Sequence, residues 1–95
     1  MKTAEILDYL RQFGLSEQPT PWDEHEYILW DVDWKEYPMY GSDCRRWSFK
    51  EENGEVEKIF LTIYDSKFGG LETTINEIHD MSELVKSIDV FAGYL

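Results

Sequence analysis

The feature of this sequence that most constrains its fold is a pair of apolar-rich segments on either side of the polar tetrapeptide Glu52-Asn53-Gly54-Glu55. Asn and Gly favour the left-handed backbone of a tight turn, so the flanking segments are expected to pair as an antiparallel hairpin. A two-residue turn would place Trp47 opposite Phe60 and divide the apolar side chains between both faces of the hairpin. A three-residue turn, with Gly54 in the left-handed position, would instead place Trp47 opposite Ile59.

We predict the three-residue turn because it gathers the apolar side chains where one core can cover them. The residues expected on the core face are Phe49, Ile59, Leu61 and Ile63. The residues expected mainly on the other face are Arg46, Ser48, Lys50, Lys58, Thr62 and Tyr64.

A further strand is expected before this hairpin, over residues 26–37, where apolar and polar residues alternate. Its core face would carry Ile28, Trp30, Val32 and Trp34. Its wet face would carry Tyr27, Leu29, Asp31, Asp33 and Lys35. Pro38 is expected to end the strand, because proline lacks the N–H group that a sheet ladder needs.

A helix is predicted near the start of the chain, over residues 4–13, with Thr3 as its N-cap. Spacing of i, i+3 and i+4 predicts one apolar stripe that faces the core: Ile6, Leu7, Leu10 and Phe13. Gly14 is expected to end the helix in the left-handed conformation. Residues 16–23 contain two prolines and are interpreted as a loop.

Two interpretations fit the last quarter of the chain. Residues 71–78 are rich in Thr and Ile, which favours a strand. Asp80 followed three residues later by Glu83 is close to a capping box, which would start a helix over residues 81–92. The alternative is one long helix over residues 73–92. We prefer the strand followed by a helix whose inward side chains are Leu84, Val85, Ile88 and Phe91.

These elements predict a single α+β domain over residues 1–95, built from two layers. One layer is an antiparallel meander of three to four strands, and an N-terminal and a C-terminal helix pack on one of its faces. The chain is 42% hydrophobic and 16% aromatic, which supplies the large side chains that one core requires. A chain of 95 residues is long enough for one core and too short for two.

Charge restricts the kinds of partner that the protein can have. Acidic residues number 20 and basic residues 9, for a formal net charge of -11. Such a field attracts basic surfaces, so we expect neither direct nucleic-acid binding nor membrane binding. The excess is concentrated in residues 16–43, where eight acidic residues accompany a single lysine, Lys35. The eight are Glu17, Asp23, Glu24, Glu26, Asp31, Asp33, Glu36 and Asp43.

Few groups in the sequence suit catalysis. Cys44 is the only cysteine, so an internal disulfide is excluded and a reducing, cytoplasmic location is expected. His25 and His79 have no spacing that links them to Cys44 in a nucleophilic or zinc site. No phosphate-binding glycine loop is present. We expect no catalytic, cofactor-binding or metal-binding residue, and the alternative is a cation or acid/base pair made by Asp31 and Asp33.

Aromatic residues coincide with the acidic segment. Trp30 and Trp34 share a strand face with core residues and are expected to be buried, whereas Trp22 and three tyrosines are freer. Exposed rings beside carboxylates suit a partner rich in Arg and Lys, through cation–π contacts and charge pairing. The predicted partner-binding residues are Trp22, Asp23, Glu24, Glu26, Tyr27, Asp31, Asp33, Glu36, Tyr37, Tyr40 and Asp43.

The leading hypothesis is a nucleic-acid mimic that occupies the basic groove of a DNA- or RNA-binding protein. Side chains on one strand face recur every ~6.8 Å, twice the ~3.4 Å advance per nucleotide of one DNA strand, so Asp31 and Asp33 could imitate phosphates. In size, charge and element content the chain resembles small acidic α+β inhibitors that phages direct against restriction enzymes, CRISPR effectors and uracil-DNA glycosylase. That resemblance implies a phage anti-defence inhibitor that acts in the host cytoplasm.

Three alternatives stay open. An immunity or antitoxin protein that neutralises a basic toxin would carry the same charge. An adaptor or assembly subunit could be acidic for solubility alone. A small enzyme or metal-binding protein could use Asp31 and Asp33 with a histidine. For the binding functions we expect a monomer or a weak dimer.

Overall fold

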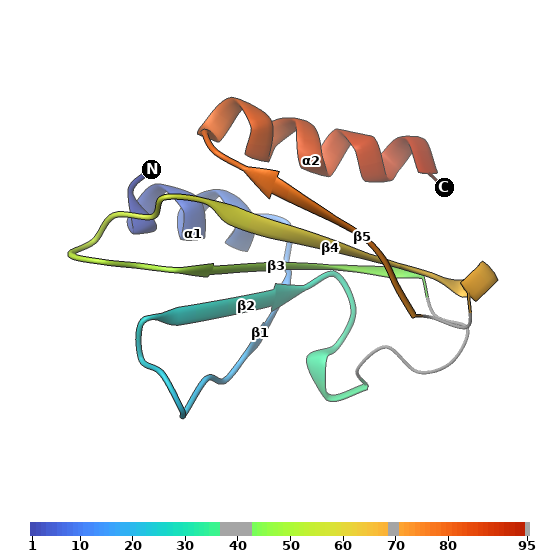
Figure 1. Cartoon of the computed structure of the whole chain (residues 1–95), viewed down its shortest axis with the longest axis horizontal. Helices are drawn as coiled ribbons and strands as arrows, with labels where there is room; N and C mark the ends of the chain where they lie inside the picture. Colours follow the sequence, from blue (N-terminus) through green and yellow to red (C-terminus); the bar gives the residue numbers. More distant parts are fainter. Residues whose placement is uncertain (37–42, 69–70, 95) are drawn as a thin grey trace.

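The structure is a computed structural model that describes residues 1–36, 43–68 and 71–94, and of residues 68, 71–73 and 89–94 only the backbone. The chain begins and ends with a helix, and the segments between them form an antiparallel five-stranded sheet of order β1-β2-β3-β4-β5 (Figure 1). In chain order the elements are α1 (Thr3–Arg11), β1 (Ser16–Gln18), β2 (Glu26–Trp30), the 3-10 helix η1 (Trp34–Glu36), β3 (Cys44–Lys50), β4 (Ile59–Asp65), the 3-10 helix η2 (Ser66–Phe68), β5 (Leu71–Ile78) and α2 (Met81–Tyr94). The predicted α+β meander is confirmed, with five strands in place of three to four.

Both long helices contribute to one core on the same face of the sheet. Ile6 and Leu10 of α1 and Leu84 of α2 are fully buried in a cluster that includes Trp47 of β3. Complete burial of a large apolar side chain stabilises a fold by about 1.5–3 kcal/mol relative to exposure, so this cluster is the main support of the two layers. We call this side of the sheet the helix-covered face.

The hairpin of β3 and β4 has the predicted faces and a different turn. Its tip is a two-residue turn in which Asn53 and Gly54 have φ of 54° and 78°, closed by two hydrogen bonds between Glu52 and Glu55. Val56 then leaves the hairpin ladder and pairs with Met1, at 2.7 Å from its N–H to the Met1 carbonyl oxygen. Because of this detour, the register that follows differs from both alternatives considered for the sequence.

Trp47 lies opposite Leu61, two residues from the predicted partner Ile59, and Phe49 lies opposite Ile59. A shift of two residues keeps every side chain on its face, since side chains alternate with a period of two. Trp47, Phe49, Ile59 and Leu61 are accordingly all buried in the helix-covered core. The predicted pairing was wrong, and the predicted core face is confirmed.

β2 is shorter than predicted and buried on both faces. It ends at Trp30, and the 3-10 helix η1 replaces the expected strand over residues 34–36. Leu29, predicted to face water, is only 1% exposed and belongs to the helix-covered core. Trp30 points the other way into a second cluster with Ile28, Cys44 and Tyr64, against which Val32 and Trp34 pack. The prediction that Leu29 and Asp31 face water was therefore wrong, because β2 has no face that is open to solvent.

β1 occupies part of the segment that was interpreted as a loop. Its three residues pair with β2, from Ser16 opposite Trp30 to Gln18 opposite Ile28. Gln18 also accepts a 2.8 Å hydrogen bond from the indole N–H of Trp30. The strand consists only of polar residues, so no apolar alternation announces it in the sequence.

The ends of α1 differ from the prediction at three residues. Thr3 is a buried residue of the helix itself, and Lys2 stands at the N-cap without a side-chain cap. The helix ends at Arg11, which leaves Phe13 beyond it and 45% exposed, with its ring edge-on to Tyr9. Gly14 has the predicted left-handed conformation, with φ of 68°.

The strand-then-helix interpretation of the last quarter of the chain is confirmed by β5 and α2. The Asp80 carboxylate accepts the backbone N–H of Glu83 at 2.8 Å, and Glu83 accepts that of His79, so the predicted capping pair is present in a modified form. Val85 is 40% exposed and not inward as predicted, and the side chain of Phe91 lies outside the described residues. In the described part of the chain neither helix could cross a membrane.

Candidate partner-binding surface

The carboxylates that the sequence groups into one acidic segment lie at opposite ends of β2. Asp23 and Glu24 precede the strand, and Asp31 and Asp33 follow it. The strand separates the two groups by about 14 Å at ~3.4 Å per residue. These residues, all predicted to bind the partner, therefore do not lie together on one surface.

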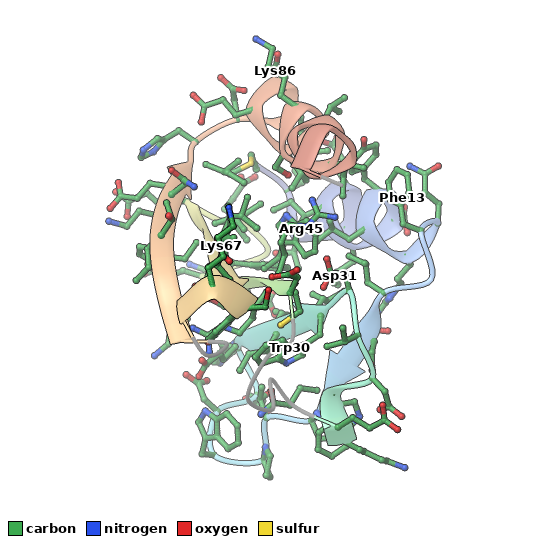
Figure 2. All side chains as sticks on the ribbon, turned by 90° about the vertical axis from the view of Figure 1, so that its right-hand side faces the viewer. Phe13, Trp30, Asp31, Arg45, Lys67 and Lys86 are labelled. Atoms are coloured by element: carbon green, nitrogen blue, oxygen red, sulfur yellow. The ribbon has the colours of Figure 1, made fainter. Side chains whose placement is uncertain are left out.

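Asp31 is a structural residue at the far end of β2. Its carboxylate accepts the backbone N–H of Arg45 at 2.7 Å and the guanidinium Nε of Arg45 at 3.0 Å. The side chains of Asp31 and Arg45 are 10% and 6% exposed. Figure 2 shows the two labelled side chains next to one another. Burial lowers the pKa of Arg45, and the hydrogen bond from Arg45 to Asp31 opposes that change. With its charge paired inside the fold, Asp31 is not available to imitate an exposed phosphate.

Arg45 links this ion pair to α2. Its Nη1 donates to the Ser87 carbonyl oxygen at 2.8 Å, and its guanidinium lies 4.6 Å from the ring centre of Trp47. The indole N–H of Trp47 donates to the Ser87 hydroxyl at 3.1 Å, and that hydroxyl donates to the Leu84 carbonyl oxygen. The polar groups of this buried network are paired with one another, which is the condition for burying charge without a large penalty.

The remaining predicted acids near this end bind backbone N–H groups or stand exposed. Asp33 accepts the backbone N–H of Lys35 at 3.0 Å, and Asp43 accepts that of Ser66 at 2.6 Å. Glu36 is exposed. Asp33 thus holds a turn, in the way that aspartate commonly does, whereas Asp43 binds the first residue of η2, 23 positions further along the chain. Two further predicted residues, Tyr37 and Tyr40, lie outside the described residues.

The opposite end of the sheet joins two acidic turns that are distant in sequence. The backbone N–H of Glu51 donates to the His25 carbonyl oxygen at 2.9 Å, and Lys50 lies 3.4 Å from the Asp23 carboxylate. We call this region the acidic end. Its carboxylates are Asp23, Glu24, Glu26, Glu51, Glu52, Glu55 and Glu57.

The acidic end surrounds an open groove of about 790 Å³. Its cations are the side chains of Lys2, Lys50 and Lys58 and the N-terminal ammonium group, which leave the seven carboxylates three charges in excess. The N-terminal ammonium group is buried beside it, 3.7 Å from Glu55. Four of the seven carboxylates, those of residues 51–57, were missed by sequence reasoning, because only the pairing of β2 with β3 brings them beside residues 23–26.

The aromatic residues of the acidic end differ in exposure. Trp22 is 60% exposed, and its indole N–H donates to the Glu26 carboxylate at 2.7 Å. Tyr27 is half-buried, stacks on Phe49 at 5.2 Å and donates its hydroxyl to Glu51 at 3.2 Å. Burial raises the pKa of Tyr27, and the Glu51 charge adds to the effect. Trp22 is thus the ring that a partner can reach most fully.

Groups with catalytic potential are few in the part of the chain that the structure describes. Cys44 is buried, and burial, followed by the charges of Asp31 and Asp43, raises the pKa of its thiol to about 11. A thiol with that pKa is a poor nucleophile at neutral pH, because only the thiolate reacts readily. Residues 1–36, 43–68 and 71–94 bring no three His, Cys, Asp or Glu side chains together around one metal position.

Comparison of the chain with family models, with curated proteins and with solved structures finds no match. Its function must therefore be argued from its own surfaces.

Proposed function

We propose that this protein is a small acidic binding protein that acts by occupying a basic surface of another protein through its acidic end. The observation that carries the proposal is the exposed ring of Trp22, which donates to Glu26 and adjoins Asp23, whose side chain lines one groove with the carboxylates of residues 51–57. A tryptophan face attracts Lys and Arg cations, and the carboxylates around it supply charge pairing with the same residues.

The partner that fits this surface best is a nucleic-acid-binding protein whose basic groove the acidic end would occupy. In this form the protein would be an inhibitor of the phage anti-defence kind, and the carboxylates that replace phosphates are those of the acidic end, without Asp31. A reducing cytoplasm suits such a role, since the single thiol of Cys44 is buried and unpaired by any disulfide.

The experiment is a pull-down with the immobilised protein from cells of its source, repeated at low and high salt. Charge-driven binding should weaken steeply as salt rises. Glu24→Gln with Glu52→Gln and Glu57→Gln should reduce affinity for the captured partner about tenfold, if each exposed ion pair contributes ~0.5 kcal/mol.

The control variant changes the same number of charges elsewhere: Glu5→Gln, Asp8→Asn and Glu36→Gln, all at exposed positions. It should bind as the unchanged protein does. Equal binding by the two triple variants would refute the role of the acidic end. Duplex DNA added as a competitor should displace a nucleic-acid-binding partner, whereas a partner that DNA leaves bound would refute the nucleic-acid-mimic form.

A further inference from the structure

β5 is an edge strand that is unusually open to a further partner. Among the described strands its only neighbour is β4, which pairs with it along its length. Residues 74–77 are exposed on both faces of the sheet, since Thr74 and Asn76 point to one face and Ile75 and Glu77 to the other. The outer edge of an eight-residue strand offers backbone N–H and C=O groups that a further strand can use.

The sequence of β5 lacks two of the features that usually protect an edge, because the strand contains no lysine and no proline. It has one irregularity, at Thr73, which has no partner in the register with β4 and lies near the start of the strand, before residues 74–77. Lysines, prolines and bulges commonly prevent an edge strand from pairing with other chains. Both charged residues of β5 are acidic: Glu72 and Glu77.

Ile75 supplies an apolar contact at the centre of this edge. It lies opposite Thr62 of β4, on the face away from α1 and α2, and is 53% exposed. An exposed β-branched residue at the middle of a strand favours a cross-strand apolar neighbour, which adds about 0.2–1 kcal/mol per pair.

We infer that β5 accepts an extended basic segment of a partner protein as a sixth strand of the sheet. The basic character of that segment rests on the proposed function, and the strand addition itself rests on the open edge. Residues 71–94 carry five acidic residues against one lysine, Lys86. Lys58 of the preceding segment pairs with Glu77 at 3.4 Å, and the balance stays negative, so an incoming strand with Lys or Arg meets a complementary field. Main-chain hydrogen bonds would hold the segment and Ile75 would set its position.

A second copy of this chain fits the edge poorly. Each copy carries a formal charge of -11, so two copies repel one another, and a register with Glu72 opposite Glu77 would place two carboxylates in direct opposition. Like charges placed opposite one another destabilise a strand pair. The partner strand is therefore a basic segment of another protein.

The test uses a synthetic peptide about ten residues long, with alternating Lys and Val and blocked ends, which is long enough to span β5. Binding to the full chain is followed by amide NMR shifts and by hydrogen exchange. The expected result is slower exchange of β5 amides and affinity about tenfold above that of the matching Glu/Val peptide. The same Lys/Val peptide methylated on its backbone nitrogens should not bind, because it cannot donate to the edge. Equal binding of all three peptides, or protection elsewhere than β5, would overturn the inference.

Ile75→Lys places a cation in the centre of the edge and should abolish peptide binding. The matched control is Phe13→Lys, another exposed apolar residue, which Figure 2 shows on the right of the molecule while the orange β5 lies on its left. The control should bind the peptide as before, and both variants should keep their amide spectra folded. Sedimentation of the unchanged chain should show no dimer, and a dimer with protected β5 amides would overturn the choice of occupant.

The two proposals fail in different measurements. If the proposal for the acidic end is wrong, the Glu24, Glu52 and Glu57 triple variant still captures its partner, while the defined peptide continues to slow the exchange of β5 amides. If the proposal for the β5 edge is wrong, the peptide does not slow that exchange, while salt and the triple variant still weaken capture in the pull-down.

Discussion

Glu26 and Asp31 stand at opposite ends of β2 and use their carboxylates in opposite ways. Glu26 accepts a hydrogen bond from the exposed indole of Trp22 and belongs to the acidic end, where Lys50 and Lys58 line a pocket with it. Asp31 pairs with the buried guanidinium of Arg45, and the two charges cancel inside the fold. The difference is made by the neighbouring strand, which presents Lys50 beside one end of β2 and Arg45 beside the other. A carboxylate can thus serve binding or stability according to the partner that the sheet provides.

The largest test of this comparison is Asp31→Asn, which keeps the shape of the side chain and removes its charge. The buried Arg45 then loses the counter-charge that Asp31 supplies, so we expect the free energy of unfolding to fall by about 3 kcal/mol. Asp33→Asn, two residues later and exposed, should cost less than ~1 kcal/mol. Urea denaturation of the two variants measures both values, and equal stability would contradict the structural role of Asp31.

A double variant separates loss of the pair from loss of packing. Asp31→Leu together with Arg45→Met removes both charges and fills a similar volume with apolar atoms. Its free energy of unfolding should recover most of the loss, since replacing a buried ion pair by apolar groups is often neutral or better. If the double variant is less stable than Asp31→Asn, the hydrogen bonds from Arg45 to Asp31 and to Ser87 matter more than the charges.

The fold could be predicted where local patterns and long-range packing agree. The alternation of Trp47 and Phe49 with polar residues assigns their face, because a register error of two residues leaves a face unchanged. The register itself could not be predicted, since it depends on Val56 pairing with Met1, more than fifty residues away in sequence. No residue near the turn indicates that Val56 pairs with Met1.

The candidate surface could be predicted only in part. Trp22 and its acidic neighbours were recognised from the charge of their own segment, and Trp22 is exposed as expected. Glu51 and Glu52 were not, because their proximity to residue 25 depends on the pairing of β2 with β3. Asp31 was misassigned because alternation alone cannot tell a strand face covered by helices from one that meets water.

Cys44 is buried at the same end of β2 as Asp31 and allows a second test with a smaller expected effect. Its thiol pKa is raised to about 11 from an ordinary 9.0, so thiolate at pH 8 should be roughly a hundredfold scarcer than in an unfolded chain. Alkylation by iodoacetamide should therefore be slow in the folded protein and fast in urea. The raised pKa stabilises the fold fully below pH 9, and this contribution should be lost as the pH rises from 9 toward 11. Fast alkylation at pH 8 without denaturant would contradict the burial of the thiol.

Charges of the acidic end should contribute almost nothing favourable to folding. Glu52→Gln with Glu57→Gln removes two exposed carboxylates from a region with excess negative charge. The free energy of unfolding should change by less than ~0.5 kcal/mol, in the stabilising direction, because repulsion among the remaining carboxylates falls. Urea denaturation at low salt gives the value. A loss as large as that of Asp31→Asn would erase the distinction between the two ends.

The smallest expected effect is in the titration of Asp23, a carboxylate of the acidic end whose pKa is lowered from 3.8. The main cause is the backbone N–H of His25, which donates to its carboxylate at 2.9 Å, and the exposed Lys50 adds a lesser contribution. Because the folded pKa is the lower one, the contribution to stability is present above pH 3.8 and is lost as the pH falls through the folded value.

Carbon-detected NMR titration of the side chain measures this pKa directly. Lys50→Met should raise the pKa of Asp23 only slightly, because the backbone donor remains. The control Lys58→Met removes the lysine that pairs with Glu77 and should leave the pKa of Asp23 unchanged. A large rise in Lys50→Met would mean that Lys50 holds Asp23 as firmly as Arg45 holds Asp31. The two ends of β2 would then differ in exposure alone, because an exposed lysine would have the same effect as a buried arginine.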